Sequence, residues 1–128
     1  MGVAAMEPNL VLRTCAVLLA LAAVGGVSMA VMRFGGKPQP PTWLAMLHGF
    51  LAAAAVTLLL YASATVGLSV VANGALALFL GAAAGGAYMN LEFHWKSLPL
   101  PKWLVLVHGA IAVAGYLLLL AAAFASRT

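Results

Sequence analysis

The sequence predicts an all-α membrane protein whose four transmembrane helices form a single bundle over residues 1–128. The first reason is composition: 66% of the residues are hydrophobic and only 6% are charged, whereas a soluble domain carries about 25% charged residues. The second reason is that the chain contains four apolar runs, each near the roughly 20 residues that a helix needs to cross the hydrocarbon core of a bilayer. The third reason is an internal repeat that joins these runs in pairs.

The four predicted spans follow one another with short connections. The first covers about 10–32 and is followed by Arg33 and the helix-breaking run 35–38, which reads Gly-Gly-Lys-Pro. The second span covers about 42–62, the third about 68–89 and the fourth about 102–125. A few small residues at 63–67 join the second and third spans, and the connections 33–41 and 90–101 join the others.

Shifting the sequence by sixty residues aligns its two halves, with the first repeat at about 10–62 and the second at about 68–125. Matching Leu and Ala residues are common by chance in an apolar chain, but matching Trp, His and Pro residues and a Gly pair at one offset are not. The matched positions are Gly25-Gly26 with Gly85-Gly86, Met29 with Met89, Pro41 with Pro101, Trp43 with Trp103, and His48-Gly49 with His108-Gly109.

The repeat also predicts how the helices are arranged. Each copy contains two spans, so both copies enter the membrane in the same orientation, related by an axis along the membrane normal. The second and fourth spans therefore run parallel, and we expect a compact four-helix bundle. Because the first span recurs inside the chain, we interpret it as part of the fold and not as a cleaved signal peptide.

The cationic residues lie near the ends of the apolar runs, with no basic stripe or aromatic platform, so we expect no nucleic-acid partner. The Lys and Arg bias of short flanks predicts connections 33–41 and 90–101 in the cytoplasm and both termini outside, in what we expect to be a bacterial inner membrane. The counts behind this orientation are Arg33, Lys37, Lys96 and Lys102 on one side against Arg13 and Arg127 on the other.

Two histidines, His48 and His108, lie at matching places within the second and fourth spans. Ionisable side chains inside a span are costly and are candidates for function. Each follows its tryptophan, Trp43 or Trp103, by five residues, which places it about 7–8 Å deeper in a helix. Since these spans are parallel, we expect both histidines at one depth.

Small residues surround the expected positions of the two histidines. One turn further along the same spans lie alanines, and glycine pairs lie at about the same depth on the first and third spans. Small side chains permit close approach of another helix or of a flat ligand. The candidate binding residues of this kind are Gly25, Gly26, Gly85, Gly86, Ala52 and Ala112.

Two facing imidazoles in an apolar gap suggest axial ligation of a haem iron, since neutral imidazole is a common axial ligand and bundle cores commonly hold cofactors. The macrocycle would fill the gap. Its propionates would lie toward the nearby interface, where Lys37, Lys102 and the indole N–H groups of Trp43 and Trp103 are available.

With these features the chain resembles small four-helix b-type membrane cytochromes that hold haem between two histidines. The resemblance covers the two His-Gly spans and the four-span layout. It implies one haem b with His48 and His108 as iron ligands, and one-electron transfer with the quinone pool or a respiratory partner. Such a chain could be a haem-dependent oxidoreductase, in which the cofactor performs the chemistry.

Other functions stay open at this point. The histidines could form interhelical hydrogen bonds only, or serve another metal, a chlorin-type pigment or a proton. The chain could be a non-catalytic anchor or assembly subunit of a larger redox complex, a homodimer, or a small transporter that depends on histidine. The two acids, Glu7 and Glu92, lie outside the spans, which disfavours carboxylate-coupled export. His94 is expected in a surface loop, with contact to a propionate or to a quinone left open.

Overall fold

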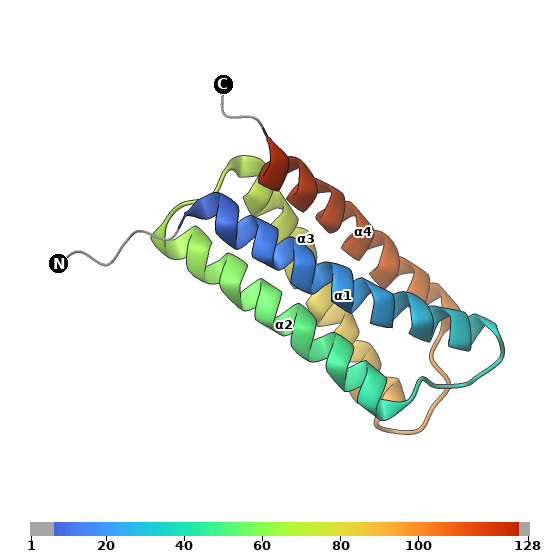
Figure 1. Ribbon diagram of the computed structural model, residues 1–128. Coiled ribbons are helices and arrows are strands. Elements are labelled where there is room, and N and C mark those ends of the chain that lie inside the picture. The colour runs from blue at the N-terminus through green and yellow to red at the C-terminus, as the bar shows by residue number, and fades with distance from the viewer. Residues whose placement is uncertain (1–6, 126–128) are drawn as a thin grey trace.

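The computed structural model describes residues 7–125 and has the predicted four-helix architecture (Figure 1). Each of the four long helices is apolar and long enough to cross a membrane, as expected for an integral membrane protein. The helices are α1 (Pro8–Phe34), α2 (Thr42–Thr65), α3 (Val70–Met89) and α4 (Lys102–Phe124), with a π-helical turn, η1 (Asn90–His94), continuing α3.

Local sequence explains where the helices begin and end. Proline precedes or opens α1, α2 and α4, where its missing N–H is not needed. The side chain of Ser69 accepts a hydrogen bond from the Ala72 amide and caps α3, so this helix begins at Val70 and not at 68 as predicted. After α1 the chain turns at Gly36, whose φ of 105° suits glycine.

The four helices are arranged as a ring in chain order. The helix α1 contacts α2 and α4, and α3 likewise contacts α2 and α4, so α2 and α4 occupy one diagonal of the bundle. The contacts within each repeat, α1 with α2 and α3 with α4, are the most extensive. Both described ends of the chain lie at one end of the bundle, and the connections 35–41 and 95–101 lie at the other (Figure 1). We call this other end the loop end.

The packed core occupies the half of the bundle nearest the termini. There all four long helices contribute buried residues to one core. Its fully inaccessible members include Cys15, Ala55, Leu59 and Leu119. In the loop-end half, residues 23–54 and 83–114, the buried positions are Pro40, Leu44 and Leu100 alone. The loop-end half therefore has no comparable core of its own.

Hydrogen bonds between the two repeats close the loop end. Nε of Arg33 donates to the Leu100 carbonyl at 2.7 Å, and Nε2 of Gln39 donates to the carbonyls of Phe93 and Leu98 at 3.1 and 2.7 Å. The amide of Leu100 donates to the Pro38 carbonyl at 3.2 Å. The two connections are thus joined by hydrogen bonds in which groups of one repeat donate to backbone carbonyls of the other.

The connection 90–101 differs from the sequence prediction, because helical structure continues through His94. In η1 the amide of Trp95 donates to the Asn90 carbonyl at 2.8 Å, five residues earlier. The next such bond runs from the Leu98 amide to the Phe93 carbonyl, also at 2.8 Å. Wider turns of this kind are rare in proteins, but where they occur they are often at functional sites.

Candidate functional site

The structure brings His48 of α2 and His108 of α4 together. Their ring centroids are 6.1 Å apart and their planes are inclined by 67°. Both side chains are half-buried. Because α2 and α4 lie on one diagonal, the rings meet across the axis of the bundle, at the boundary between the packed core and the loop-end half.

A backbone carbonyl of α1 orients the His48 ring. Nδ1 of His48 lies 2.7 Å from the carbonyl oxygen of Ala22. A carbonyl can only accept a hydrogen bond, so Nδ1 carries the proton and Nε2 keeps a free lone pair. An N–H to carbonyl bond of this kind is the usual way in which a metal-binding histidine is held in position.

The second repeat has an alanine at the equivalent position but lacks this hydrogen bond. The equivalent residue is Ala82, sixty residues after Ala22. Within the described part of the chain, however, Nδ1 of His108 is buried and has no partner in hydrogen-bonding geometry. The two histidines are therefore equivalent in position but not in the strength of their support.

The glycine pairs allow the imidazole rings to lie against the neighbouring helices. A Cβ atom at Gly26 would lie only 3.0 Å from Cε1 of His48, and a Cβ atom at Gly86 would lie 3.3 Å from Cε1 of His108. At the other member of each pair the contacts are ordinary: a Cβ atom at Gly25 would lie 3.6 Å from Cβ of His48, and one at Gly85 would lie 3.9 Å from Nδ1 of His108. The space that the sequence suggested for a flat ligand is thus occupied, at the glycines themselves, by the rings.

The remaining candidate residues lie at two levels. Ala52 and Ala112 are half-buried one turn deeper than the histidines, and Ala52 packs against the buried core. The two predicted interfacial tryptophans and the two lysines are on the outer surface of the loop end, where Nζ of Lys102 lies 5.6 Å from the centre of the Phe34 ring. The exposed fractions are 67% for Trp43 and 65% for Trp103, as an interfacial belt requires.

A third histidine takes part in the loop end, and sequence reasoning had assigned it to a surface loop. Nε2 of His94 in η1 lies 3.2 Å from Oγ1 of Thr42, the first residue of α2. Nδ1 of His94 is buried without a hydrogen-bond partner in the described structure. The sequence signal was the departure from the repeat, since residue 34 is Phe where residue 94 is His.

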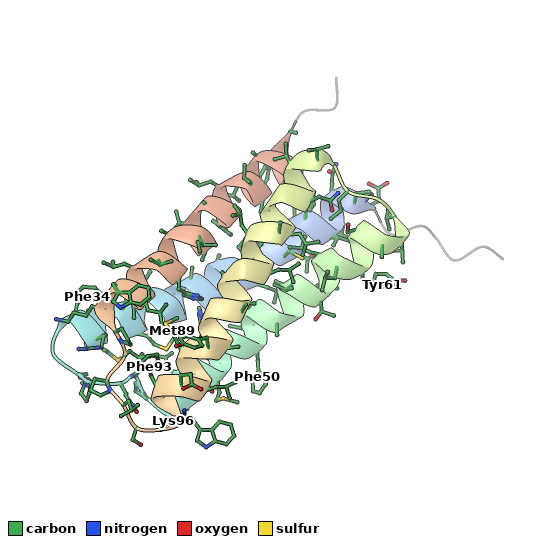
Figure 2. The ribbon with its side chains drawn as sticks, turned by 180° about the vertical axis from the view of Figure 1, so that it is seen from behind. Phe34, Phe50, Tyr61, Met89, Phe93 and Lys96 are labelled. Atoms are coloured by element: carbon green, nitrogen blue, oxygen red, sulfur yellow. The ribbon has the colours of Figure 1, made fainter. Side chains whose placement is uncertain are left out.

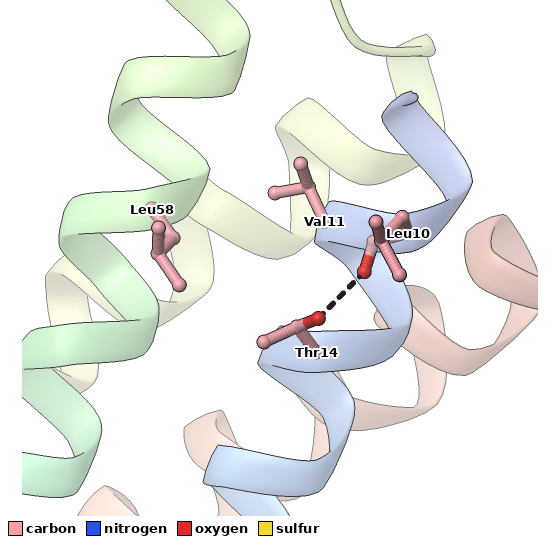
Figure 3. A pocket seen from close by; sticks show the side chains of 4 residues that line it. All are labelled: Leu10, Val11, Thr14 and Leu58. Carbon is pink, nitrogen blue, oxygen red and sulfur yellow. Dashed lines mark hydrogen bonds between the residues drawn. The ribbon is translucent and has the colours of Figure 1, made fainter. Parts of the chain in front are cut away.

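The pockets on the surface add no chemistry to this picture. One pocket, shown in Figure 3, is lined by Leu10, Val11, Thr14 and Leu58 near the termini. The Thr14 hydroxyl donates to the Leu10 carbonyl at 2.8 Å, so the pocket offers no free polar group. A second, open groove over α4 and Ala30 is lined by small and apolar residues. Neither pocket is lined by a histidine.

The histidine pair can offer at most two side-chain ligands to a metal. Among the described residues, no group of three or more His, Cys, Asp or Glu side chains could hold an ion. A metal at the pair would take its other ligands from groups other than these side chains, and the four ring nitrogens of a haem are one such set. No family model matches the sequence, and no curated protein or solved structure matches it significantly. The functional conclusion accordingly depends on the residues of the pair and their surroundings.

Proposed function

We propose that this chain is a b-type haem-binding membrane cytochrome that carries single electrons, with one haem held between His48 and His108. The observation that carries the proposal is the placing of two imidazoles, from matching positions of the two repeats, 6.1 Å apart across the bundle. The Ala22 carbonyl, Gly26 and Gly86 support the proposal because they lie against these two rings.

The separation of the rings suits two axial ligands of one iron. If each ring binds through one nitrogen with a bond of about 2 Å, as in other metal–imidazole sites, the ring centres lie roughly 6 Å apart. The hydrogen bond from Nδ1 of His48 to the Ala22 carbonyl leaves Nε2 available for such a bond. A purely structural role in hydrogen bonding between helices would explain the contact of His48 Nδ1 with the Ala22 carbonyl. It would not explain why the ring of His108 lies so close to that of His48.

The surroundings of the pair suit an apolar macrocycle with two carboxylates. The loop-end half contains few buried side chains, so a flat apolar group there would replace loosely packed residues and not a formed core. Positive charge gathers at the loop end, where Glu92 is engaged by Lys96 at 2.7 Å. Arg33, Lys37 and Lys102 are therefore available to balance propionates.

When bound, the haem would supply the one-electron chemistry, and the protein would hold, orient and shield it. His48 and His108 would ligate the iron, and Gly26 and Gly86 would keep each ring against its neighbouring helix. We propose exchange of electrons with the quinone pool or a respiratory partner in a bacterial inner membrane. A role as a haem-bearing subunit of a larger complex, or as a homodimer, is compatible with this assignment.

The test is an optical spectrum of the detergent-purified protein, oxidised and then reduced with dithionite. We expect sharp α and Soret bands from the native chain, and their loss in His48→Ala and in His108→Ala. His94→Ala is the matched control, since it removes a histidine outside the pair and should retain the bands. A colourless native protein, expressed with haem supplied, would refute the proposal, as would bands that persist in the double variant His48→Ala/His108→Ala.

A further inference from the structure

The second repeat carries polar chemistry at the loop end that the first repeat lacks. Position 34 holds a phenylalanine that is 45% exposed at the end of α1, whereas position 94 holds a histidine in a π-helical turn. The iron ligands proposed above, and the glycines beside them, are residues that the two repeats share. A residue that breaks the repeat and retains an unsatisfied nitrogen points to a second task.

The π-helical turn decides where His94 and its neighbours lie. Its five-residue spacing brings the ring of Phe93 to the ring of Tyr88, with centroids 6.0 Å apart and planes inclined by 75°. The same turn brings Nε2 of His94 to 3.2 Å from Oγ1 of Thr42 on α2. Figure 2 shows Phe93 with Met89 at this end of the bundle, far from Tyr61 at the other end.

The His94–Thr42 pair can present either a donor or an acceptor without changing its charge. If Nε2 donates to the Thr42 oxygen, Nδ1 is an acceptor; if the Thr42 hydroxyl donates to Nε2, Nδ1 carries a hydrogen and is a donor. A buried nitrogen with no partner is unfavourable in both forms. A ligand that offers a carbonyl in one state and a hydroxyl in the other would satisfy Nδ1 in each.

We propose that His94 and Thr42 form the head-group site for a membrane quinone, which binds as the quinone and as the quinol. Nδ1–H of His94 donates to a quinone carbonyl, and unprotonated Nδ1 accepts from a quinol hydroxyl. Phe93, the neighbour of His94 in η1, packs edge-on against Tyr88, and these two rings offer an aromatic surface for the quinone ring. This inference rests on the proposed cytochrome function, which explains why a redox-active ligand would bind here.

The surroundings of the site favour a ligand that arrives through the membrane. Tyr88 at the end of α3 is 53% exposed and Leu91 in η1 is 52% exposed, so the outer face of this segment would meet lipid or interface. Nδ1 itself is covered, and a ligand reaches it by displacing side chains of the loop-end half, of which few are buried. An apolar molecule with one polar ring meets both conditions.

The experiment is a titration of the purified protein, labelled with ¹⁵N at histidine, with a benzoquinone that carries a decyl tail. The NMR signal of Nδ1 of His94 should shift, and the affinity should fall at least ten-fold in His94→Phe. This substitution introduces the residue of the first repeat, which should allow folding. Thr42→Val, which keeps the side-chain shape but removes the hydroxyl, should weaken binding as well, whereas Thr42→Ser and the control Phe34→Leu should not.

The haem spectrum of each sample separates this inference from the cytochrome proposal. Unchanged haem bands with weakened quinone binding in His94→Phe would support both. A native protein that binds quinone through His94 but holds no haem would retain the site and refute the cytochrome. Failure of the native protein to bind the quinone, or equal affinity in native, His94→Phe and Thr42→Val proteins, would overturn the site whatever the haem spectrum shows.

Discussion

At the scale of single residues, the glycines that face the histidines leave room for the imidazole rings because they have no Cβ atom. A Cβ atom on residue 26 would come within 3.0 Å of Cε1 and 3.4 Å of Nδ1 of His48. Since that ring is held by the Ala22 carbonyl at 2.7 Å, it has little freedom to withdraw. At residue 86 the approach is 3.3 Å and His108 lacks the matching hydrogen bond, so this ring can move aside.

A series of glycine-to-alanine variants tests this difference in stability. We expect Gly26→Ala to unfold at a lower temperature than the native protein and Gly86→Ala to be close to native. Overfilling a packed site costs about 1–3 kcal/mol, whereas replacing an unconstrained helical glycine by alanine gains up to about 1 kcal/mol. Gly81→Ala is the control, since its Cβ would meet nothing within 4 Å, and it should equal or exceed the native stability.

The measurement for this series is thermal unfolding in one detergent, followed by far-ultraviolet circular dichroism. Equal unfolding temperatures for Gly26→Ala and Gly81→Ala would contradict the close packing of the His48 ring against α1. If the proposed haem is bound, Gly26→Ala and Gly86→Ala should both lower the haem content, because a displaced ring is a poorer ligand, whereas Gly81→Ala should not.

Sequence reasoning reached the histidine pair because the repeat marked it. His48 and His108 share an offset with rare residues, and parallel helices bring equal depths together. It could not identify the Ala22 carbonyl, because a backbone oxygen leaves no trace in the residue type at its position. It also assigned the glycines to an open gap, since spacing along a helix does not tell which side chain of a neighbour fills the space.

At the scale of elements, the two connections stabilise one another. Each repeat alone would leave a connection with unpaired carbonyls, and Gln39 of the first serves two carbonyls of the second, those of Phe93 and Leu98. The carbonyl of Phe93 also accepts the amide of Leu98 at 2.8 Å. The π-helical turn and the connection after it are therefore fixed by contacts from residues more than fifty positions away.

Removal of these contacts should loosen the second connection without unfolding the bundle. We expect Gln39→Ala to raise the hydrogen exchange of amides 93–98 by roughly ten-fold, since a lost hydrogen bond is worth about 1 kcal/mol. Amides in the core of α2 and α4 near the termini should keep their protection. Lys37→Ala, at an exposed position of the same connection, is the control and should leave exchange unchanged.

Exchange that is equal in the Gln39→Ala and Lys37→Ala variants would show that the connections do not depend on the Gln39 side chain.

The contacts between the two connections also explain which elements the sequence could predict. Apolar length and flanking prolines located the four long helices to within a few residues. The continuation of α3 into η1 could not be predicted, because Thr42 and Gln39 of the other repeat stabilise it and no local pattern marks it.

At the scale of the whole molecule, one half of the bundle holds the packed core, and the other half holds the residues to which we assign ligand binding. The half near the termini buries Leu59 and Leu119 at matching positions of the repeats, and Phe79 where the first repeat has Leu19. The loop-end half holds the histidine pair, the unpartnered nitrogen of His94 and most of the positive charge. A stable half thus supports a half whose residues can be rearranged by a ligand.

The orientation that we predict for this bundle rests on the same distribution of charge and can be tested with single cysteines. Cys15 is the only native cysteine and is fully buried, and alanine at the equivalent residue 75 of the second repeat makes Cys15→Ala a suitable background. In that background we place Pro38→Cys at the loop end and Ala64→Cys at the opposite end, both at exposed positions. With cytoplasmic connections 33–41 and 90–101, a membrane-impermeant maleimide should label residue 64 on spheroplasts, and residue 38 only after permeabilisation.

The reverse labelling pattern would invert the orientation while leaving the fold intact. Labelling of both from one side would contradict the fold itself, because α2 spans the membrane between residue 38, which precedes it, and residue 64 near its end.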